Sequence, residues 1–186
     1  MYKDSTLKKY LDDLSAKLPA PGGGSASALS AALGVSLISM VINFTLGKSR
    51  YARYENELRF ILRNSENLRK EFLRLVDLDV LAYKSKNIKK ALKVPLRTAD
   101  LCFKGIEFCP TLIKKANVNL ISDLAVAAIL LEAGFASAYF NILINLRSLK
   151  DKGLSLKINK EFKRKLKQIK KIRLKTEEEI GKIIRG

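Results

Sequence analysis

Apolar residues recur at intervals of three and four positions along most of this 186-residue chain. That spacing gathers them on one face of an α-helix, and no segment shows the two-residue alternation of a half-buried strand. Turn-forming residues are few and clustered, since the chain has 10 Gly and 4 Pro. The pattern predicts an all-α fold: a single domain over 1–186, built as a bundle of about six long antiparallel helices.

The predicted helices follow from this periodicity and from the positions of capping and breaking residues. Asp4 or Ser5 would cap the first helix, whose apolar stripe is Leu7, Tyr10, Leu11, Leu14 and Leu18. Pro95 would begin the fourth helix, because proline is favoured in a first helical turn. The remaining helices are expected at about 25–46, 51–87 and 119–149 and, after a turn at 151–155, in a basic segment carrying Ile158 to Ile183.

The segment 25–46 carries no charge and is long enough to cross a bilayer. It also contains six Ser and Thr residues and one Asn, and most of its apolar side chains are small. These features favour a helix buried on all sides by other helices over a membrane span. We therefore expect a soluble protein with no membrane partner, and a homodimer whose interface includes this helix.

The charge is strongly basic, with 36 Lys and Arg against 18 Asp and Glu. Nucleic acid, an anionic membrane or a polyanionic small molecule could each be the partner, and a merely lysine-rich surface is the alternative. The chain has no His, so acid–base chemistry falls to Asp, Glu, Lys, Tyr, Cys or water, and no metal site is expected. Cys102 and Cys109 fit buried thiols, and with no secretory signal at the start we expect a cytoplasmic protein.

Two aspartates in the sequence LVDLDVLAY are predicted to differ. A projection at about 100° per residue places Asp79 on the apolar face with Phe72, Leu75 and Tyr83. The same projection places Asp77 on the opposite face among basic side chains, where we expect it to be solvated. A carboxylate on the core side costs free energy unless it is paired or used. Asp79 is therefore a candidate catalytic group, with a buried salt bridge or helix cap as the alternative.

One face of the predicted helix 119–149 combines small residues with Asp123, Asn141 and Asn145. Small side chains let another helix approach closely, and the polar groups could either bind a ligand or link helices. Asp123 and Asn141 are about five turns apart, so they cannot serve the same small site.

The sequence PGGGS at 21–25 places glycines before a helix, where free backbone N–H groups favour an anion. It is neither a Walker loop nor a dinucleotide fingerprint, because no strand precedes it and no Gly-Lys-Ser/Thr follows. As a motif on its own it is weak.

Six segments occur in this order along the chain: PAPGGGSASALSAALGVSLISMV, TLGK, LVDLDVLAY, VPL, NLISDLAVAA and AYFNILINL. Together they resemble the formiminotransferase-cyclodeaminase C-terminal domain family, over about residues 10–150. The family includes stand-alone methenyltetrahydrofolate cyclohydrolases. The resemblance implies a folate site near a dimer interface and bordered by the glycine turn, with Asp79 as the catalytic carboxylate and no metal or redox cofactor. The implied substrate-binding residues are Gly22, Gly23, Gly24, Ser25, Asp123, Asn141 and Asn145, with Lys48 and the lysines of 84–93 as candidates for the glutamates of a polyglutamylated folate.

The implied reaction is the hydrolysis of 5,10-methenyltetrahydrofolate to 10-formyltetrahydrofolate, with formiminotetrahydrofolate cyclodeaminase as the alternative. A non-enzymatic basic helical protein that binds nucleic acid or anionic surfaces is the competing class, which the charge leaves open. The chain departs from the family between Tyr83 and Val94, where family members usually carry a longer helix–loop–helix segment. The shorter connection puts activity in question more than fold, because a pocket wall, lid or subunit contact would be missing.

Overall fold

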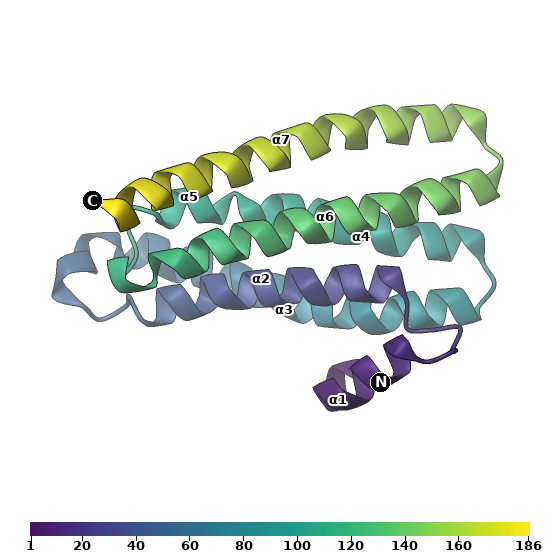
Figure 1. Ribbon diagram of the computed structural model, residues 1–186, viewed down its shortest axis with the longest axis horizontal. Helices are drawn as coiled ribbons and strands as arrows, with labels where there is room; N and C mark the ends of the chain where they lie inside the picture. Colours follow the sequence, from purple (N-terminus) through teal and green to yellow (C-terminus); the bar gives the residue numbers. More distant parts are fainter.

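The computed structural model describes residues 1–186 and contains seven α-helices, three short 3-10 helices and no strand, which confirms the all-α prediction (Figure 1). The α-helices are α1 (Leu7–Ser15), α2 (Gly23–Asn43), α3 (Glu55–Lys84), α4 (Ile88–Ile106), α5 (Phe108–Leu112), α6 (Ile121–Leu149) and α7 (Lys152–Arg185). The 3-10 helices are η1 (Tyr2–Asp4), η2 (Ser49–Tyr54) and η3 (Val118–Leu120).

Helix α2 occupies the centre of the bundle and packs against α3, α4 and α6. It runs antiparallel to α6, because Gly23 lies beside Asn141 while Gly34 lies beside the backbone of Ala127. A Cβ on Gly34 would stand 3.1 Å from the Ala127 carbonyl oxygen, so glycine permits the close approach of the two helices. Small residues in the uncharged segment thus serve helix packing inside the chain.

The prediction that the helix at 25–46, now α2, is buried on all sides is wrong along one stripe of its surface. Leu33 of α2 is 52% exposed, and on neighbouring α6 Phe140 is 72% and Ile144 57% exposed. Figure 1 shows α2 and α6 together in front of α3 and α4. By length and composition, α2 and the segment 118–149 could each cross a membrane, a test that core helices also pass.

Two predicted boundaries are corrected by the capping residues. Helix α4 begins at Ile88, seven residues before Pro95, because the Asn87 side chain accepts a hydrogen bond from the Lys90 N–H at 3.1 Å. The predicted turn at 151–155 is already helical, because Asp151 caps α7 by accepting from the Leu154 N–H at 2.9 Å. The chain reverses at Lys150 instead, which has a left-handed backbone with φ of 57°.

Helix α1 is shorter than predicted and stands outside the main bundle (Figure 1). Thr6 caps it by accepting from the Lys9 N–H at 3.1 Å, rather than Asp4 or Ser5. Of its predicted stripe only Tyr10 is buried, whereas Leu7 and Leu11 are exposed. Both cysteines are fully buried, and burial raises the pKa of the Cys109 thiol to about 12, so it stays protonated at neutral pH.

Candidate active site

The start of α2 rests directly on the carboxylate of Asp79, which projects from α3. A Cβ added to Gly24 would stand 2.6 Å from Asp79 Cγ and closer still to Oδ1. Any larger residue at position 24 would therefore displace the carboxylate. The neighbouring glycines are less constrained, because a Cβ on Gly23 would make an ordinary 3.6 Å contact with Asn141 and one on Gly22 would meet nothing.

Asp79 is half-buried and accepts a hydrogen bond from the backbone N–H of Ser25, at 2.9 Å from Oδ2. Burial raises the pKa of the Asp79 carboxyl, and the Ser25 N–H offsets part of that rise because it favours the ionised form. The carboxylate also faces the N-terminus of a helix, where the helix dipole stabilises negative charge. A carboxyl of raised pKa with a fixed donor is suited to take up and return a proton.

Tyr10 is a member of this site that sequence reasoning did not include. Its side chain is 4% exposed, and its hydroxyl lies 3.2 Å from the Ser25 hydroxyl oxygen. Burial raises the pKa of Tyr10, and the nearby charge of Asp79 raises it further. The only sequence signal was that Tyr10 is the one polar-tipped residue on the apolar stripe of the first helix.

Asp77 is not solvated, which corrects the sequence-based expectation. It is 3% exposed; Oδ1 accepts the Tyr2 backbone N–H at 2.6 Å, and Oδ2 has no hydrogen-bond partner. A projection of α3 alone cannot detect this burial, because the cover comes from η1, which folds back onto the helix. Tyr2 also stacks edge-to-face on Tyr10, with ring centroids 5.3 Å apart. Asp77 therefore holds the N-terminal segment that carries Tyr10.

Asn141 and Asn145 lie one turn apart on α6, at the same end of the bundle as Asp79. Asn141 contacts the start of α2 through Gly23, while Asn145 donates from Nδ2 to the carbonyl of Ala91 at 3.1 Å. That carbonyl would ordinarily accept the N–H of residue 95, which is a proline and has none. Asn145 thus satisfies the carbonyl that Pro95 leaves free, so at least one of its roles is polar support.

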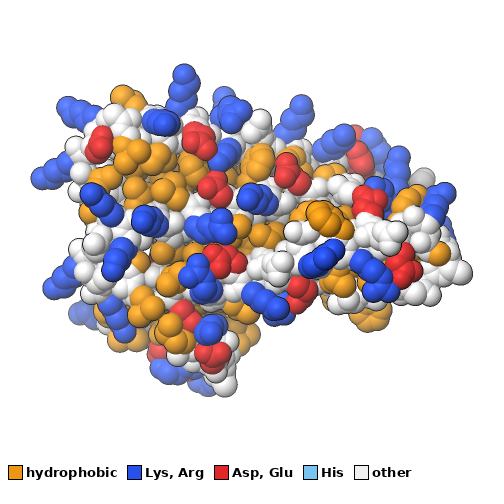
Figure 2. All heavy atoms as spheres, turned by 180° about the vertical axis from the view of Figure 1, so that it is seen from behind, with side chains coloured by type: hydrophobic (Ala, Val, Ile, Leu, Met, Phe, Trp, Pro, Cys, Tyr) orange, Lys and Arg blue, Asp and Glu red, His pale blue; other side chains and the backbone are white.

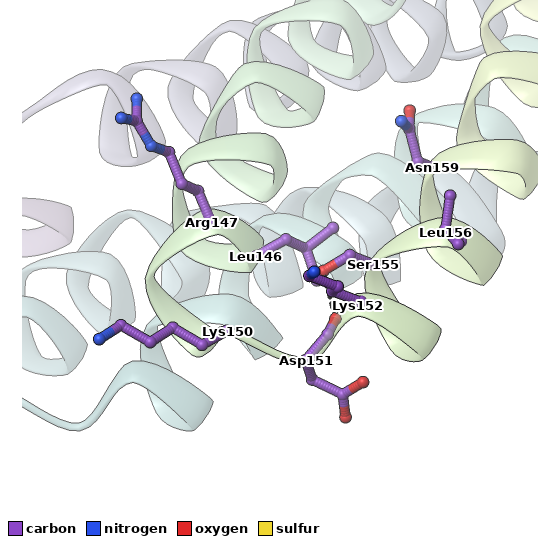
Figure 3. A pocket seen from close by; sticks show the side chains of 8 residues that line it. All are labelled: Leu146, Arg147, Lys150, Asp151, Lys152, Ser155, Leu156 and Asn159. Atoms are coloured by element: carbon purple, nitrogen blue, oxygen red, sulfur yellow. Dashed lines mark hydrogen bonds between the residues drawn. The ribbon is translucent and has the colours of Figure 1, made fainter.

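Two cavities open beside the last turns of α6, and a third, of about 340 Å³, is lined by Asp77, Tyr2 and Lys84, among others. One of the two, of about 390 Å³, begins a helical turn beyond Asp79 and is lined by Tyr83, Lys84, Lys86 and Asn145, among others. The second, of about 630 Å³, lies at the α6–α7 connection (Figure 3). In Figure 3, Arg147 and Lys150 extend from α6 and its end toward the same side, while Asn159 comes from α7. Asn145 and Leu146 are adjacent, so the two cavities flank the last turns of α6.

Lys48 and Asp123 do not join this site within one chain. Lys48 follows the far end of α2, which has 21 residues and so is about 30 Å long. Asp123 lies in the first turn of α6, at that same far end, because α2 and α6 are antiparallel. Of the predicted residues, the structure brings together Gly22–Ser25, Asp79, Asn141 and Asn145.

Comparison with known proteins places this chain in a family. The family model described as Formiminotransferase-cyclodeaminase matches residues 6–86 and 84–164. A methenyltetrahydrofolate cyclohydrolase of Methylorubrum extorquens is 33% identical over 87% of this chain and 89% of its own length. A formimidoyltransferase-cyclodeaminase of Rattus norvegicus is 30% identical over 80% of this chain but only 32% of its own length.

A solved structure extends the likeness to the whole fold. The formiminotetrahydrofolate cyclodeaminase of Thermotoga maritima superposes with a TM-score of 0.92 and 26% identity, over 99% of this chain and 100% of that one. The short α3–α4 connection therefore does not separate this bundle from a protein described as a cyclodeaminase. Together with the family match over most of the chain, this shows that the chain belongs to the formiminotransferase-cyclodeaminase family.

Proposed function

We propose that the protein hydrolyses 5,10-methenyltetrahydrofolate to 10-formyltetrahydrofolate. The observation that carries the proposal is Asp79, a half-buried carboxyl of raised pKa fixed at a helix N-terminus one turn from a cavity. The cyclohydrolase of Methylorubrum extorquens, similar over nearly the whole of both chains, supports this choice of reaction.

The chemistry needs one base and one acid at a carbon between two nitrogens. Water adds to the methenyl carbon while Asp79 takes one of its protons. The bond from that carbon to N5 then breaks as Asp79 returns the proton to N5, and the added hydroxyl loses its proton to solvent as it becomes the formyl carbonyl. The formyl group remains on N10, and one proton is released to solvent overall. Ionised Asp79 would also stabilise the positive charge of the substrate. These steps use the carboxylate and water, so we propose no metal or redox cofactor.

The second candidate reaction is cyclodeamination of 5-formiminotetrahydrofolate, in which N10 attacks the formimino carbon and ammonia leaves. The likeness to the Thermotoga maritima cyclodeaminase over the whole bundle favours it. The purified protein should be assayed with both folates, following methenyl absorbance in one arm and ammonia release in the other. Turnover of methenyltetrahydrofolate without ammonia release from the formimino substrate supports the first reaction, and the reverse result overturns it.

We further propose that a polyglutamylated folate lays its tail along the basic side chains of the two cavities. Lys84 and Lys86 line the smaller cavity, and Arg147, Lys150 and Lys152 line the larger. The carboxylates of a glutamate tail that extends away from Asp79 would thus meet these cations one after another. Lys48 lies outside this path within one chain, and so does Asp123; a role for either at this site would need a second subunit.

A cytoplasmic homodimer is also part of the proposal, with α2 and α6 at the interface. Leu33 of α2 and Phe140 and Ile144 of α6 are exposed apolar side chains on these two helices, and contact with a second copy would remove them from water. Light scattering of Leu33→Glu should show a monomer, whereas Leu174→Glu, at a leucine of α7 that is 49% exposed against 52% for Leu33, should leave a dimer. A wild-type monomer at micromolar concentration would exclude this assembly.

A further inference from the structure

Helix α7 carries half of the formal net charge of the protein, with thirteen Lys and Arg against four Glu among its residues, out of a total of +18. Within it, six exposed basic residues lie on one side of the helix. We call them the α7 ridge: Lys160, Lys163, Arg164, Lys167, Lys170 and Lys171.

The charges of the ridge are uncompensated, unlike basic residues elsewhere. On α3, Arg59 pairs with Glu55 at 2.7 Å and Arg74 pairs with Glu71 at 2.8 Å. On α7 the acidic partners go to side chains outside the ridge, such as Lys165, which contacts Glu161 at 2.7 Å. No ridge residue forms an ion pair within 4.0 Å. The ridge is therefore a local source of positive field.

The ridge has the dimensions of a helix that can enter a groove. Its 12-residue span corresponds to about 17 Å of helix. Projection at about 100° per residue places Lys163 and Lys170 on one flank, Lys160, Arg164 and Lys171 on the other, and Lys167 between them. Figure 2 shows basic side chains projecting along the upper edge of the molecule, where α7 runs.

We propose that the α7 ridge binds the phosphate backbone of double-stranded DNA, without sequence preference. The major groove of B-DNA is about 12 Å wide and admits an α-helix, and two basic flanks would meet the phosphates on its two sides. The exposed positions between Lys160 and Lys171 carry charged or amide side chains, so no exposed aromatic is available there to stack on single-stranded bases. Exposed leucines of α7 lie only beyond the two ends of the ridge, the nearest being Leu156 at 72% and Leu174 at 49%, too far apart for the continuous apolar face with which a helix enters a bilayer. This surface is independent of the Asp79 site and of the reaction proposed there.

The test is fluorescence anisotropy with a labelled mixed-sequence duplex, titrated with the full-length protein at several salt concentrations. If six phosphates are neutralised, log K should fall against log salt with a slope of about −5. Replacing Lys163, Lys167 and Lys170 together by Gln should reduce the slope to about −3 and weaken binding at every sequence tested. The matched control replaces Lys70, Lys104 and Lys114, three exposed lysines on other parts of the chain, by Gln and should keep most of the slope.

The outcomes separate the possible partners. A shallower dependence of log K on log salt in the ridge variant but not in the control supports the proposal, provided both variants melt at the wild-type temperature. Absence of duplex binding at low salt overturns it, as does equal loss in the two triple variants. Tighter binding to single-stranded DNA or to acidic phospholipid vesicles than to the duplex also overturns it. Equal affinity for duplex RNA excludes docking in the major groove, because that groove is narrow in A-form helices.

Discussion

Asp77 and Asp79 leave α3 two residues apart, and each accepts one backbone N–H. Asp79 receives it from Ser25 at the start of α2 and lies one turn from a cavity. Asp77 receives it from Tyr2, is almost fully buried and leaves Oδ2 without a partner. Burial alone therefore does not distinguish a candidate catalytic carboxylate, since the more buried aspartate holds the N-terminal segment in place. What distinguishes Asp79 is its contact with the start of α2, where Ser25 N–H is a fixed donor, Gly24 lies against the carboxylate and burial raises the pKa of the carboxyl.

The largest effect should come from removing the carboxylate that meets the start of α2. Asp79→Asn should lower turnover by about 10²-fold or more, the usual scale for loss of a general acid–base group. Asp77→Asn should change turnover only slightly, because its amide oxygen can still accept the Tyr2 N–H. Steady-state rates on both folates measure the contrast. Full activity in both variants, or loss only in Asp77→Asn, would place the site elsewhere.

The pH dependence sharpens the same contrast. Because burial raises the pKa of Asp79 above its ordinary 3.8, the fold disfavours the ionised form, and stability should fall as pH rises through the raised pKa. Asp79→Asn removes this cost, so its melting temperature at neutral pH should equal or exceed that of wild type. The wild-type rate should rise with pH through the same raised pKa. Thermal melts and pH–rate profiles of wild type and Asp79→Asn provide the comparison.

The next effect concerns the glycine that lets α2 reach Asp79. Gly24→Ala should lower turnover on the order of tenfold to a hundredfold, because the added Cβ must displace the carboxylate from its position. Gly22→Ala is the matched control, since a Cβ there meets nothing within 4 Å. Turnover and melting temperature should be measured for both variants. Equal activity in the two would show that the close approach to Asp79 has no catalytic consequence.

A smaller effect is expected at Tyr10, which links the two aspartates through Ser25 and Tyr2. Tyr10→Phe keeps the ring but removes the hydroxyl contact with Ser25, and turnover should fall about fivefold, corresponding to one net hydrogen bond. Tyr51→Phe is the control, because its buried hydroxyl accepts the Val118 N–H at the far end of the bundle. If Tyr10 acts on the site, its loss should also displace the acid limb of the pH–rate profile. Equal turnover and an equal pH profile in the two variants would leave Tyr10 only a packing role.

The smallest effect is expected on the binding of the glutamate tail of the substrate. Arg147→Gln with Lys150→Gln should raise KM for a folate polyglutamate by about twofold to fivefold, since exposed charge pairs are weak and screened. KM for the monoglutamate should not change, and added salt should weaken polyglutamate binding more than monoglutamate binding. Equal salt sensitivity of the two ligands would show that the basic cavities do not hold the tail.

Helical periodicity predicted the fold and much of the site. The apolar faces gave the number of long helices. The phase of α3 placed Asp79 on the side that meets α2, but it was wrong for Asp77, which η1 buries. Periodicity placed Tyr83 on the core face with Asp79, but Tyr83 is exposed because α3 is in its last turn there. The sequence predicts a helix start at Pro95, because it does not reveal that Asn145 supplies the hydrogen bond that lets α4 continue through this proline.

By itself, the sequence determined the secondary structure and the residue types available for chemistry. A histidine-free chain with one aspartate on an apolar helix face left a carboxylate as the natural acid–base group, and glycines before a helix indicated a close backbone approach. Only the tertiary structure decided which of these groups meet. It put Gly24 against Asp79, covered Asp77 with η1 and added Tyr10 to the site, while it separated Lys48 and Asp123 from that site by the length of α2. The physical reason is that helix periodicity fixes the direction of a side chain relative to its own axis, whereas neighbours are set by contacts between helices far apart in sequence.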